Sequence, residues 1–237
     1  MIFNKVHCLF EQSGTFRDIF KKYGYAAFDY DICNDFMKTN YQCDLFYQIN
    51  CAYDNKKSIL DNIKEDDLVI AFFPCTRFET QISMAFRGDS FQMKKWNDSK
   101  KLEYSIKLHN ELHNNYIILC KLCIIAYNRK WKLIIENLYT QPHYLTSYFP
   151  IKQKVIDFDR RIDGDYYKKP TQYFFINCEP GFTFLNPIQN NMNYSITKNK
   201  GINGMNRKVS RSLINPLYAE RFINRYILDN DIYRGDL

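Results

Sequence analysis

The sequence has few residues that break secondary structure and no long hydrophobic run. It contains 8 Gly and 7 Pro in 237 residues, which excludes collagen-like and low-complexity chains. The longest apolar runs, such as Leu68–Phe73, are far shorter than the roughly 18 residues of a membrane span. No basic segment followed by a long apolar stretch opens the chain, so no secretory signal is expected. We therefore expect a globular cytoplasmic protein without a membrane partner.

The sequence also lacks the spacing patterns of disulfide frameworks and metal sites. Its 8 cysteines are scattered through apolar segments, as reduced thiols of a core are. Cys120 and Cys123 form the one C-x-x-C, and without a second pair they indicate two helix residues facing a core. His109 and His113 have helical i, i+4 spacing, but Glu111 stands one position too late for the zinc-protease helix motif. No metal site is predicted.

The chain is rich in aromatic residues, and its charges are unevenly distributed. Aromatics make up 17% of the residues, which excludes disordered classes. The net charge is +7, yet residues 1–67 carry eight basic and eleven acidic side chains. The most basic stretch has no acid and contains Lys198, Lys200, Arg207, Lys208 and Arg211. This stretch indicates either a polyanion-binding segment or an ordinary solvated loop.

Strand-like and helix-like segments alternate along the chain. Short apolar runs predict strands at Val6–Phe10, Ala26–Tyr30, Leu68–Phe73, Lys132–Ile135 and Gln172–Asn177. Helical periodicity predicts helices at Phe16–Tyr23, Lys101–Asn128 and Pro216–Ile227. Such alternation predicts an α/β fold, with a mostly parallel sheet covered by helices on both faces. Ligands bind such sheets beyond the carboxyl ends of the strands.

Polar residues follow the predicted strands at that edge. The loop Gln12–Thr15 follows the first strand, and Asp29 stands at the end of the second. The loop brings backbone amides toward a ligand, and the acid suits ribose hydroxyls. Together they favour an adenosine-type cofactor over a structural turn. The G-x-G-x-x-G pattern is missing, so a dinucleotide is not expected.

The next two strand ends carry a candidate nucleophile and a candidate acid. Cys75 follows Pro74, and Arg77 beside it is expected to stabilise a thiolate. The alternative is a buried cysteine behind a turn-forming proline. Glu136–Asn137 ends the fourth predicted strand, where the fold would bring it near Cys75. A nucleophile with a neighbouring carboxyl group predicts covalent catalysis assisted by an acid.

Taken in order, these segments resemble the motifs of the cytosine-5 DNA methyltransferase family. The resemblance is carried by Leu9–Phe16, Asp29–Asp31, Asp44–Leu45, Pro74–Cys75, Glu136–Asn137, Lys168–Tyr173 and Arg211 through Asn215–Pro216. It implies a Rossmann-like class I fold that binds S-adenosylmethionine. The implied cofactor residues are Phe10, Gln12, Ser13, Gly14, Thr15, Asp29, Tyr30, Asp44, Leu45, Phe73, Pro74 and Asn215. By the same resemblance, Asp29 would hold the ribose, Tyr30 would face the adenine ring and Asp44 its amino group.

The resemblance also implies a covalent mechanism on a cytosine of DNA. The base would be flipped out of the duplex, Cys75 would attack ring carbon 6, and Glu136 would hydrogen-bond ring nitrogen 3. Asn137 and Arg77 complete the expected catalytic group. DNA contacts are expected from Lys168, Lys169 and Thr171, and from the basic stretch that ends at Arg211.

Several features depart from the family pattern and leave alternatives open. Gln12 and Thr15 stand where the family has glycines, and Thr76 stands where it has glutamine. The implied domains are a catalytic domain over 1–178, a short basic insertion over 179–210 in place of a target-recognition domain, and a returning helical segment over 211–237. Target specificity would then be slight, come from a partner protein, or be read by the Arg77–Lys101 insertion.

Three functions compete at this point. The first is a DNA cytosine-5 methyltransferase resembling small phage-encoded enzymes, acting in the cytoplasm of a bacterium or an infected host. The second is a catalytically silent module of the same fold that holds cofactor or nucleic acid for a partner. The third is a methyltransferase acting on another pyrimidine, in RNA or in a free nucleotide.

Overall fold

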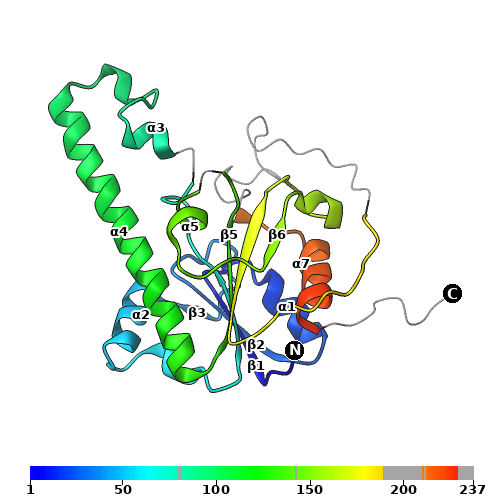
Figure 1. The fold of residues 1–237 in the computed structure, drawn as a ribbon. Coiled ribbons are helices and arrows are strands. Elements are labelled where there is room, and N and C mark those ends of the chain that lie inside the picture. The colour runs from blue at the N-terminus through cyan, green and yellow to red at the C-terminus, as the bar shows by residue number, and fades with distance from the viewer. Residues whose placement is uncertain (80–81, 142, 189–209, 211, 229–237) are drawn as a thin grey trace.

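One seven-stranded sheet organises the chain. The computed structural model describes residues 1–79, 82–141, 143–188, 210 and 212–228 (Figure 1). The strand order is β3-β2-β1-β4-β5-β7-β6. The strands are β1 (Lys5–Leu9), β2 (Ala26–Asp31), β3 (Tyr41–Gln42), β4 (Leu68–Phe72), β5 (Lys132–Leu138), β6 (Val155–Asp157) and β7 (Thr171–Ile176). Strands β1 to β5 pair in parallel, whereas β7 is antiparallel to both β5 and β6.

The mostly parallel α/β sheet that the sequence predicted is confirmed, and it is compatible with a Rossmann-like fold. After β1 the chain moves outward to β2 and β3, then returns to the other side of β1 as β4. The loops after β1 and β4 therefore leave the sheet in opposite directions and open a crevice at its carboxyl edge.

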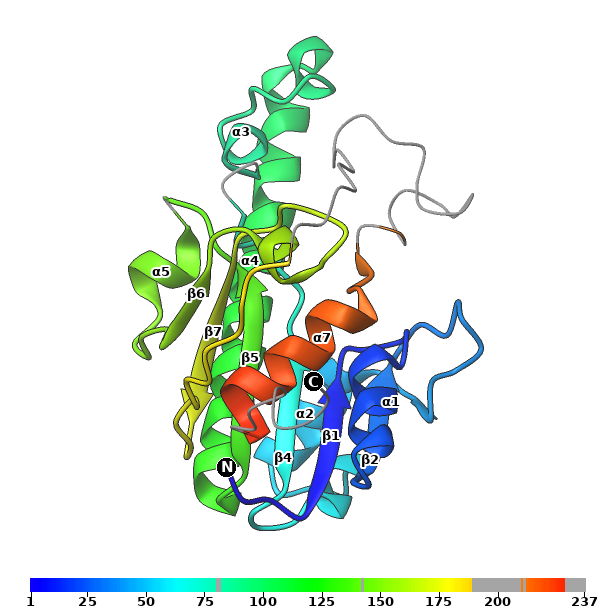
Figure 2. The ribbon, with the colours of Figure 1, turned by 90° about the vertical axis from the view of Figure 1, so that its right-hand side faces the viewer.

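Helices cover both faces of the sheet (Figures 1 and 2). They are α1 (Thr15–Lys22), α2 (Leu45–Tyr53), α3 (Ser83–Phe86), α4 (Asp98–Arg129), α5 (Tyr144–Tyr148) and α7 (Pro216–Ile223). One core joins α2, α4 and α5 to Val69, Ala71 and Ile135. The other joins α1 and α7 to Leu68 and Ile70. Alternate residues of one strand thus supply opposite cores, because strand side chains alternate between the two faces.

Short turns and caps set the element ends. Asn97 caps α4 by accepting a hydrogen bond from the Lys100 amide at 2.9 Å, so α4 begins ahead of the predicted Lys101. Single 3₁₀ turns occur at Ile59–Asn62, Met93–Lys95 and Arg160–Asp163, and α7 continues as a π-helical turn over Asn224–Leu228. Strand β5 continues through Glu136 and Asn137 to Leu138, because all three pair with β7, so the predicted end of this strand was too early.

The amino-terminal half of α4 projects beyond the sheet together with α3 (Figure 1). We call residues 82–108 the arm. A small separate core holds it together, made of Ala85, Met93 and Leu108 with Ile82, Phe86, Trp96 and Tyr104. Within the described ranges, no helix is both long and apolar enough to cross a membrane.

Candidate functional site

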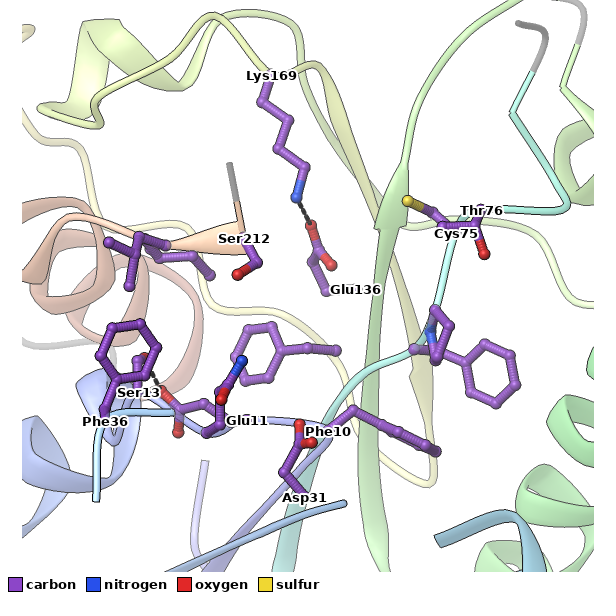
Figure 3. A pocket seen from close by; sticks show the side chains of 16 residues that line it. Phe10, Glu11, Ser13, Asp31, Phe36, Cys75, Thr76, Glu136, Lys169 and Ser212 are labelled. Atoms are coloured by element: carbon purple, nitrogen blue, oxygen red, sulfur yellow. Dashed lines mark hydrogen bonds and ion pairs between the residues drawn. The ribbon is translucent and has the colours of Figure 1, made fainter. Parts of the chain in front are cut away.

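A cavity of about 230 Å³ opens at the carboxyl edge of the sheet. It is lined by the loop after β1, the end of β2, the loop after β4, the end of β5, the segment before β7 and the approach to α7. Figure 3 shows Cys75, Glu136, Lys169, Glu11 and Asp31 around it. The sequence analysis expected a site at this edge, and the topology explains why these segments meet at the β1–β4 crevice.

Cys75 lines this cavity, three residues beyond the end of β4. Its Sγ donates a hydrogen bond to Glu79 Oε1 at 2.9 Å. Burial raises the pKa of the Cys75 thiol to about 12, and the charges of Glu79 and Glu136 also raise it. The cysteine is therefore a thiol at neutral pH in this state, and a thiolate needs a change of surroundings such as the arrival of a substrate.

The cation that acts on Cys75 is Lys169, and the prediction that it is Arg77 was wrong. The charge of Lys169 lowers the Cys75 pKa, and both residues line the same cavity. Arg77 instead forms an ion pair with Glu111 of α4 and lines a different cavity. The reason is that a carboxylate on α4, far along the chain, holds the guanidinium away from the thiol.

Glu136 faces the cavity between two cations. Its Oε1 lies 3.5 Å from Arg160 Nη1 and 3.8 Å from Lys169 Nζ, and Figure 3 shows Lys169 reaching down to it. Arg160 is fully buried; it also pairs with Asp165 at 2.7 Å and lies over the Tyr218 ring. The sequence analysis missed Arg160, because no local pattern marks an arginine that will be buried.

Asn137 points to the other face of β5 and has a structural contact. Its Nδ2 donates to the Phe73 carbonyl oxygen at 3.0 Å, and the side chain is buried. The bond ties β5 to the backbone just before Pro74 and Cys75. Asn137, predicted as a catalytic residue, therefore positions the loop after β4 that carries Cys75 (residues 73–79, the cysteine loop) and does not line the cavity.

The loop after β1 forms the floor of the cavity. Phe10, Gln12 and Ser13 line it, as three of the predicted cofactor residues. Phe10 has a left-handed backbone with φ of +60°, which is uncommon for a bulky residue and marks a strained turn at this edge. Gln12 Oε1 accepts a hydrogen bond from the Asp35 amide at 3.0 Å, which ties this loop to the one after β2.

Gly14 has the Arg17 guanidinium packed against its Cα. Its φ is +71°, and a Cβ atom there would clash with Arg17 Nη2. The glycine is thus required by its backbone conformation and by the guanidinium packed over it. Arg17 therefore packs over the Cα of Gly14, while the approach of a cofactor to the backbone amides of this loop stays a prediction.

Asp29 is buried and already paired, so the prediction that it is open to a ribose was wrong. Its Oδ2 lies 2.8 Å from Arg17 Nη1, and its Oδ1 accepts from the Asn40 amide at 2.7 Å. Tyr30 packs into the core and stacks on Tyr41. The acid that lines the cavity is Asp31, because β2 runs one residue further than the sequence predicted.

Glu11 is a second acid on this side, and it was not among the predicted site residues. It is buried, and its Oε1 accepts hydrogen bonds from the Phe16 amide at 2.9 Å and the Ser13 hydroxyl at 3.3 Å. Its Oε2 is buried with no hydrogen-bond partner among the described residues. Burial raises the pKa of Glu11 to about 7. Its position directly after the first strand was the signal that could have found it.

The remaining predicted cofactor residues are divided between the cavity and structural positions. Pro74 and Phe73 line the cavity. Asp44 caps α2 through the amides of Phe46 and Tyr47, and Leu45 is buried in the core. Outside the cavity, Thr15 hydrogen-bonds Ser13 and Asn215 caps α7 through the Leu217 amide.

The residues predicted to bind nucleic acid differ in their exposure, and some lie outside the described residues. Lys168 is exposed, just outside the cavity that Lys169 lines. Thr171 is buried in β7, and its hydroxyl donates to the Lys169 carbonyl oxygen, so a direct DNA contact from its side chain was a wrong prediction. Five predicted contacts lie outside the described residues, namely Lys198, Lys200, Arg207, Lys208 and Arg211.

No cluster of three or more His, Cys, Asp or Glu side chains that could hold a metal occurs in the part of the chain that the structure describes. Cys120 and Cys123 lie on α4, against the core that covers one face of the sheet. A comparison of the sequence with models of known protein families found no match, and neither did a comparison with curated proteins.

Proposed function

We propose that the protein is an S-adenosylmethionine-dependent DNA cytosine-5 methyltransferase with Cys75 as its nucleophile. The observation that carries this proposal is the pairing of the Cys75 thiol and the Glu136 carboxylate in one cavity. These groups come from the ends of the adjacent strands β4 and β5. The same cavity contains the loop after β1, where a sheet of this topology takes its ligands.

The residues on the β1–β2 side fit a cationic cofactor with ribose hydroxyls. Glu11 and Asp31 line the cavity, and the buried Glu11 Oε2 has no partner among the described residues. A carboxylate in that position suits an ammonium or sulfonium group, and Asp31 suits a hydroxyl pair. Phe10 and Phe36 add aromatic surface to the same side. When bound, S-adenosylmethionine would supply the methyl group.

The β4–β5 side would act on a pyrimidine ring that has been flipped out of the duplex. Glu79 is placed to take the thiol proton, since it already accepts the Cys75 hydrogen bond. Cys75 Sγ would then bond to ring carbon 6, while Glu136, carrying a proton in the substrate complex, would donate it to ring nitrogen 3 and neutralise the charge that develops on the ring. Ring carbon 5 would take the methyl group. Ring carbon 5 would then lose its proton to solvent. The electron pair left behind would re-form the double bond between ring carbons 5 and 6, break the bond between Cys75 Sγ and ring carbon 6, and release the cysteine as a thiolate.

Basic side chains next to the cavity lining and on the arm are suited to a nucleic acid. Lys168 is exposed beside the cavity mouth, and the arm carries Lys94, Lys95, Lys100 and Lys101. Phosphate contacts from such lysines supply affinity without sequence preference. An enzyme of this kind would work in the cytoplasm, in contact with cellular or phage DNA.

The test uses DNA that contains 5-fluorocytosine, together with S-adenosylmethionine. The fluorine blocks the final elimination, so a working enzyme remains bonded to DNA and shifts in mass on a denaturing gel. The wild type and Cys120→Ser should form the adduct, whereas Cys75→Ser should not. Cys120 is a matched control because it is a half-buried cysteine outside the cavity. Absence of any wild-type adduct across varied DNA would overturn the proposal.

A catalytically silent binding module is the second candidate. It is favoured by the Arg17 side chain packed over Gly14 and by the raised pKa of Cys75. Binding of DNA or S-adenosylmethionine without an adduct would support this function. An adduct with fluorinated RNA or a free fluorinated nucleotide, but not with DNA, would instead indicate another pyrimidine substrate.

A further inference from the structure

A second cavity, of about 610 Å³, lies on the other side of the cysteine loop. It is open to solvent and is lined by the residues after Cys75 and by parts of α3, α4 and α5. Its volume is within the range of small-molecule sites, roughly 300–1,000 Å³. Glu79, the hydrogen-bond partner of Cys75, lines it. The mechanism above uses no other group of this cavity.

The cavity is lined by aromatic rings and has a cationic rim. Phe78 stacks on Tyr144 with their centroids 5.9 Å apart, and Tyr144 packs against Tyr148 at 5.0 Å. The Tyr148 side chain is 68% exposed, so its ring is free to meet a ligand. Arg87 also lines the cavity; its side chain is 64% exposed, and its Nε pairs with the exposed Asp89 at 3.3 Å, which leaves the terminal nitrogens of the guanidinium to a ligand. Flat rings beside an accessible guanidinium suit a planar heterocycle that carries a phosphate.

His143 adds a hydrogen-bond donor with a fixed direction. It is buried, and its Nδ1 accepts from the Leu145 amide at 3.2 Å and from Gln172 Nε2 at 3.3 Å. Both of those partners can only donate, so the ring proton must sit on Nε2. Burial lowers the pKa of His143 to about 4, which keeps the ring neutral at pH 7.

The Nε2–H group of His143 is buried and has no acceptor among the described residues, while the residue lines the cavity. A buried donor without a partner is costly, by about 1–3 kcal/mol. A ligand that displaces the side chains covering Nε2 and brings an acceptor atom against it would remove that cost. Ring nitrogens and carbonyl oxygens at the edge of a nucleobase are such acceptors.

We infer that this cavity binds a nucleobase, with its ring against the tyrosines and an edge acceptor on His143 Nε2. The inference rests on the proposed function in one respect: the main cavity, on the other side of the cysteine loop, is taken to hold the target base. The base comes either from the bound DNA strand or from a free nucleotide. In the first case the cavity holds a base near the target; in the second it is a nucleotide effector site.

Two binding measurements distinguish these sources, and neither requires catalysis. The first is saturation-transfer NMR with the four deoxynucleoside monophosphates. The second is fluorescence polarisation with a labelled oligonucleotide that contains one cytosine and in which each flanking base is removed in turn. If the base belongs to the strand, removal at one position should weaken binding about tenfold or more. If it belongs to a free nucleotide, its base protons should receive saturation and no flanking position should matter.

Substitutions of residues that line the cavity test whether the NMR or polarisation signal comes from it. His143→Asn keeps an acceptor for the Leu145 amide but does not reach as far as Nε2, so it should abolish the signal. His143→Gln keeps a distant N–H donor and should retain part of it. Tyr148→Leu should also weaken it, and the exposure of Tyr148 allows this change without loss of the fold. His113→Asn, on an exposed residue of α4, should match the wild type.

The inference is overturned if the wild type shows neither signal, or if His143→Asn and Tyr148→Leu both keep it in full. The wild-type fluorocytosine adduct decides the proposed function independently. A nucleobase signal without an adduct would support this cavity and refute the methyl transfer. An adduct without the signal would support the methyl transfer and refute the nucleobase cavity.

Discussion

The two sides of the main cavity each hold a buried glutamate, but they balance its charge differently. Glu11, on the β1–β2 side, is 6% exposed, and Glu136, on the β4–β5 side, is 5% exposed. Glu136 lies between the cations of Arg160 and Lys169. The side chain of Glu11 is held by a backbone amide and a hydroxyl group and has no ion pair among the described residues, although each glutamate has one buried oxygen without a hydrogen-bond partner there.

This difference indicates which side awaits a charged ligand. A buried carboxylate is costly unless a cation or hydrogen-bond donors compensate it. The protein itself supplies the cations around Glu136, so that side is preorganised for a neutral ring. The Glu11 side leaves compensation to a proton, which is why its pKa is raised to about 7. A cationic ligand could replace that proton.

The largest expected effect comes from removing the buried cation beside Glu136. Arg160→Met leaves Glu136 and Asp165 without their shared partner. Breaking a buried ion pair in this way costs about 3–5 kcal/mol, so the free energy of unfolding measured in urea should fall by that amount. Arg161→Met is the matched control, because its ion pair with Asp159 is partly exposed and should be worth under about 1 kcal/mol. Equal losses in the two variants would contradict the role assigned to Arg160.

The next effect is the pH dependence that Glu11 imposes on stability. Its pKa is about 7 in the folded protein against an ordinary value of 4.5. Between these pH values the folded chain keeps a proton that the unfolded chain has lost, so stability falls as pH rises. The free energy of unfolding should fall by roughly 3 kcal/mol over this range, at about 1.4 kcal/mol per pH unit. Glu11→Gln should remove this slope.

Urea unfolding of the wild type and the Glu11→Gln variant at pH 4.5 and pH 8 measures the effect. Relative to the wild type, the variant should become more stable as the pH increases. Glu103→Gln, at an exposed position of α4, controls for the loss of one charge. If the stability difference between wild type and Glu11→Gln does not change with pH, then Glu11 is compensated and the contrast between the two sides fails.

The smallest expected effect concerns the bond that places the cysteine loop. Asn137→Ala removes the hydrogen bond to the Phe73 carbonyl and should lower stability by about 1 to 2 kcal/mol. It should also slow formation of the fluorocytosine adduct, because the backbone before Cys75 is less firmly held. Asn110→Ala, on an exposed face of α4, should change neither quantity. An unchanged adduct rate in Asn137→Ala would show that the bond is structural only.

The sequence predicted some of the residues on the two sides of the main cavity and missed others. The loop after β1, Cys75 and Glu136 were found because each follows or ends an apolar run, and the carboxyl ends of parallel strands meet at one edge. Asp31 belonged to a segment that carried the resemblance, but the role in the cofactor site was assigned to Asp29, and the predicted strand ended at Tyr30. Lys169 was found as a basic residue, but its position beside Glu136 depends on β7 lying next to β5.

The sequence by itself determined the alternation of strands and helices and the edge where the polar residues gather. Apolar runs and helical periodicity are local properties, and each element must bury its apolar side. Only the tertiary structure decided which charges meet: Arg160 with Glu136, Arg17 with Asp29, and Arg77 with Glu111. Those pairs join residues from different elements, and which cation reaches which carboxylate depends on strand register and helix placement. Neither can be read from local composition.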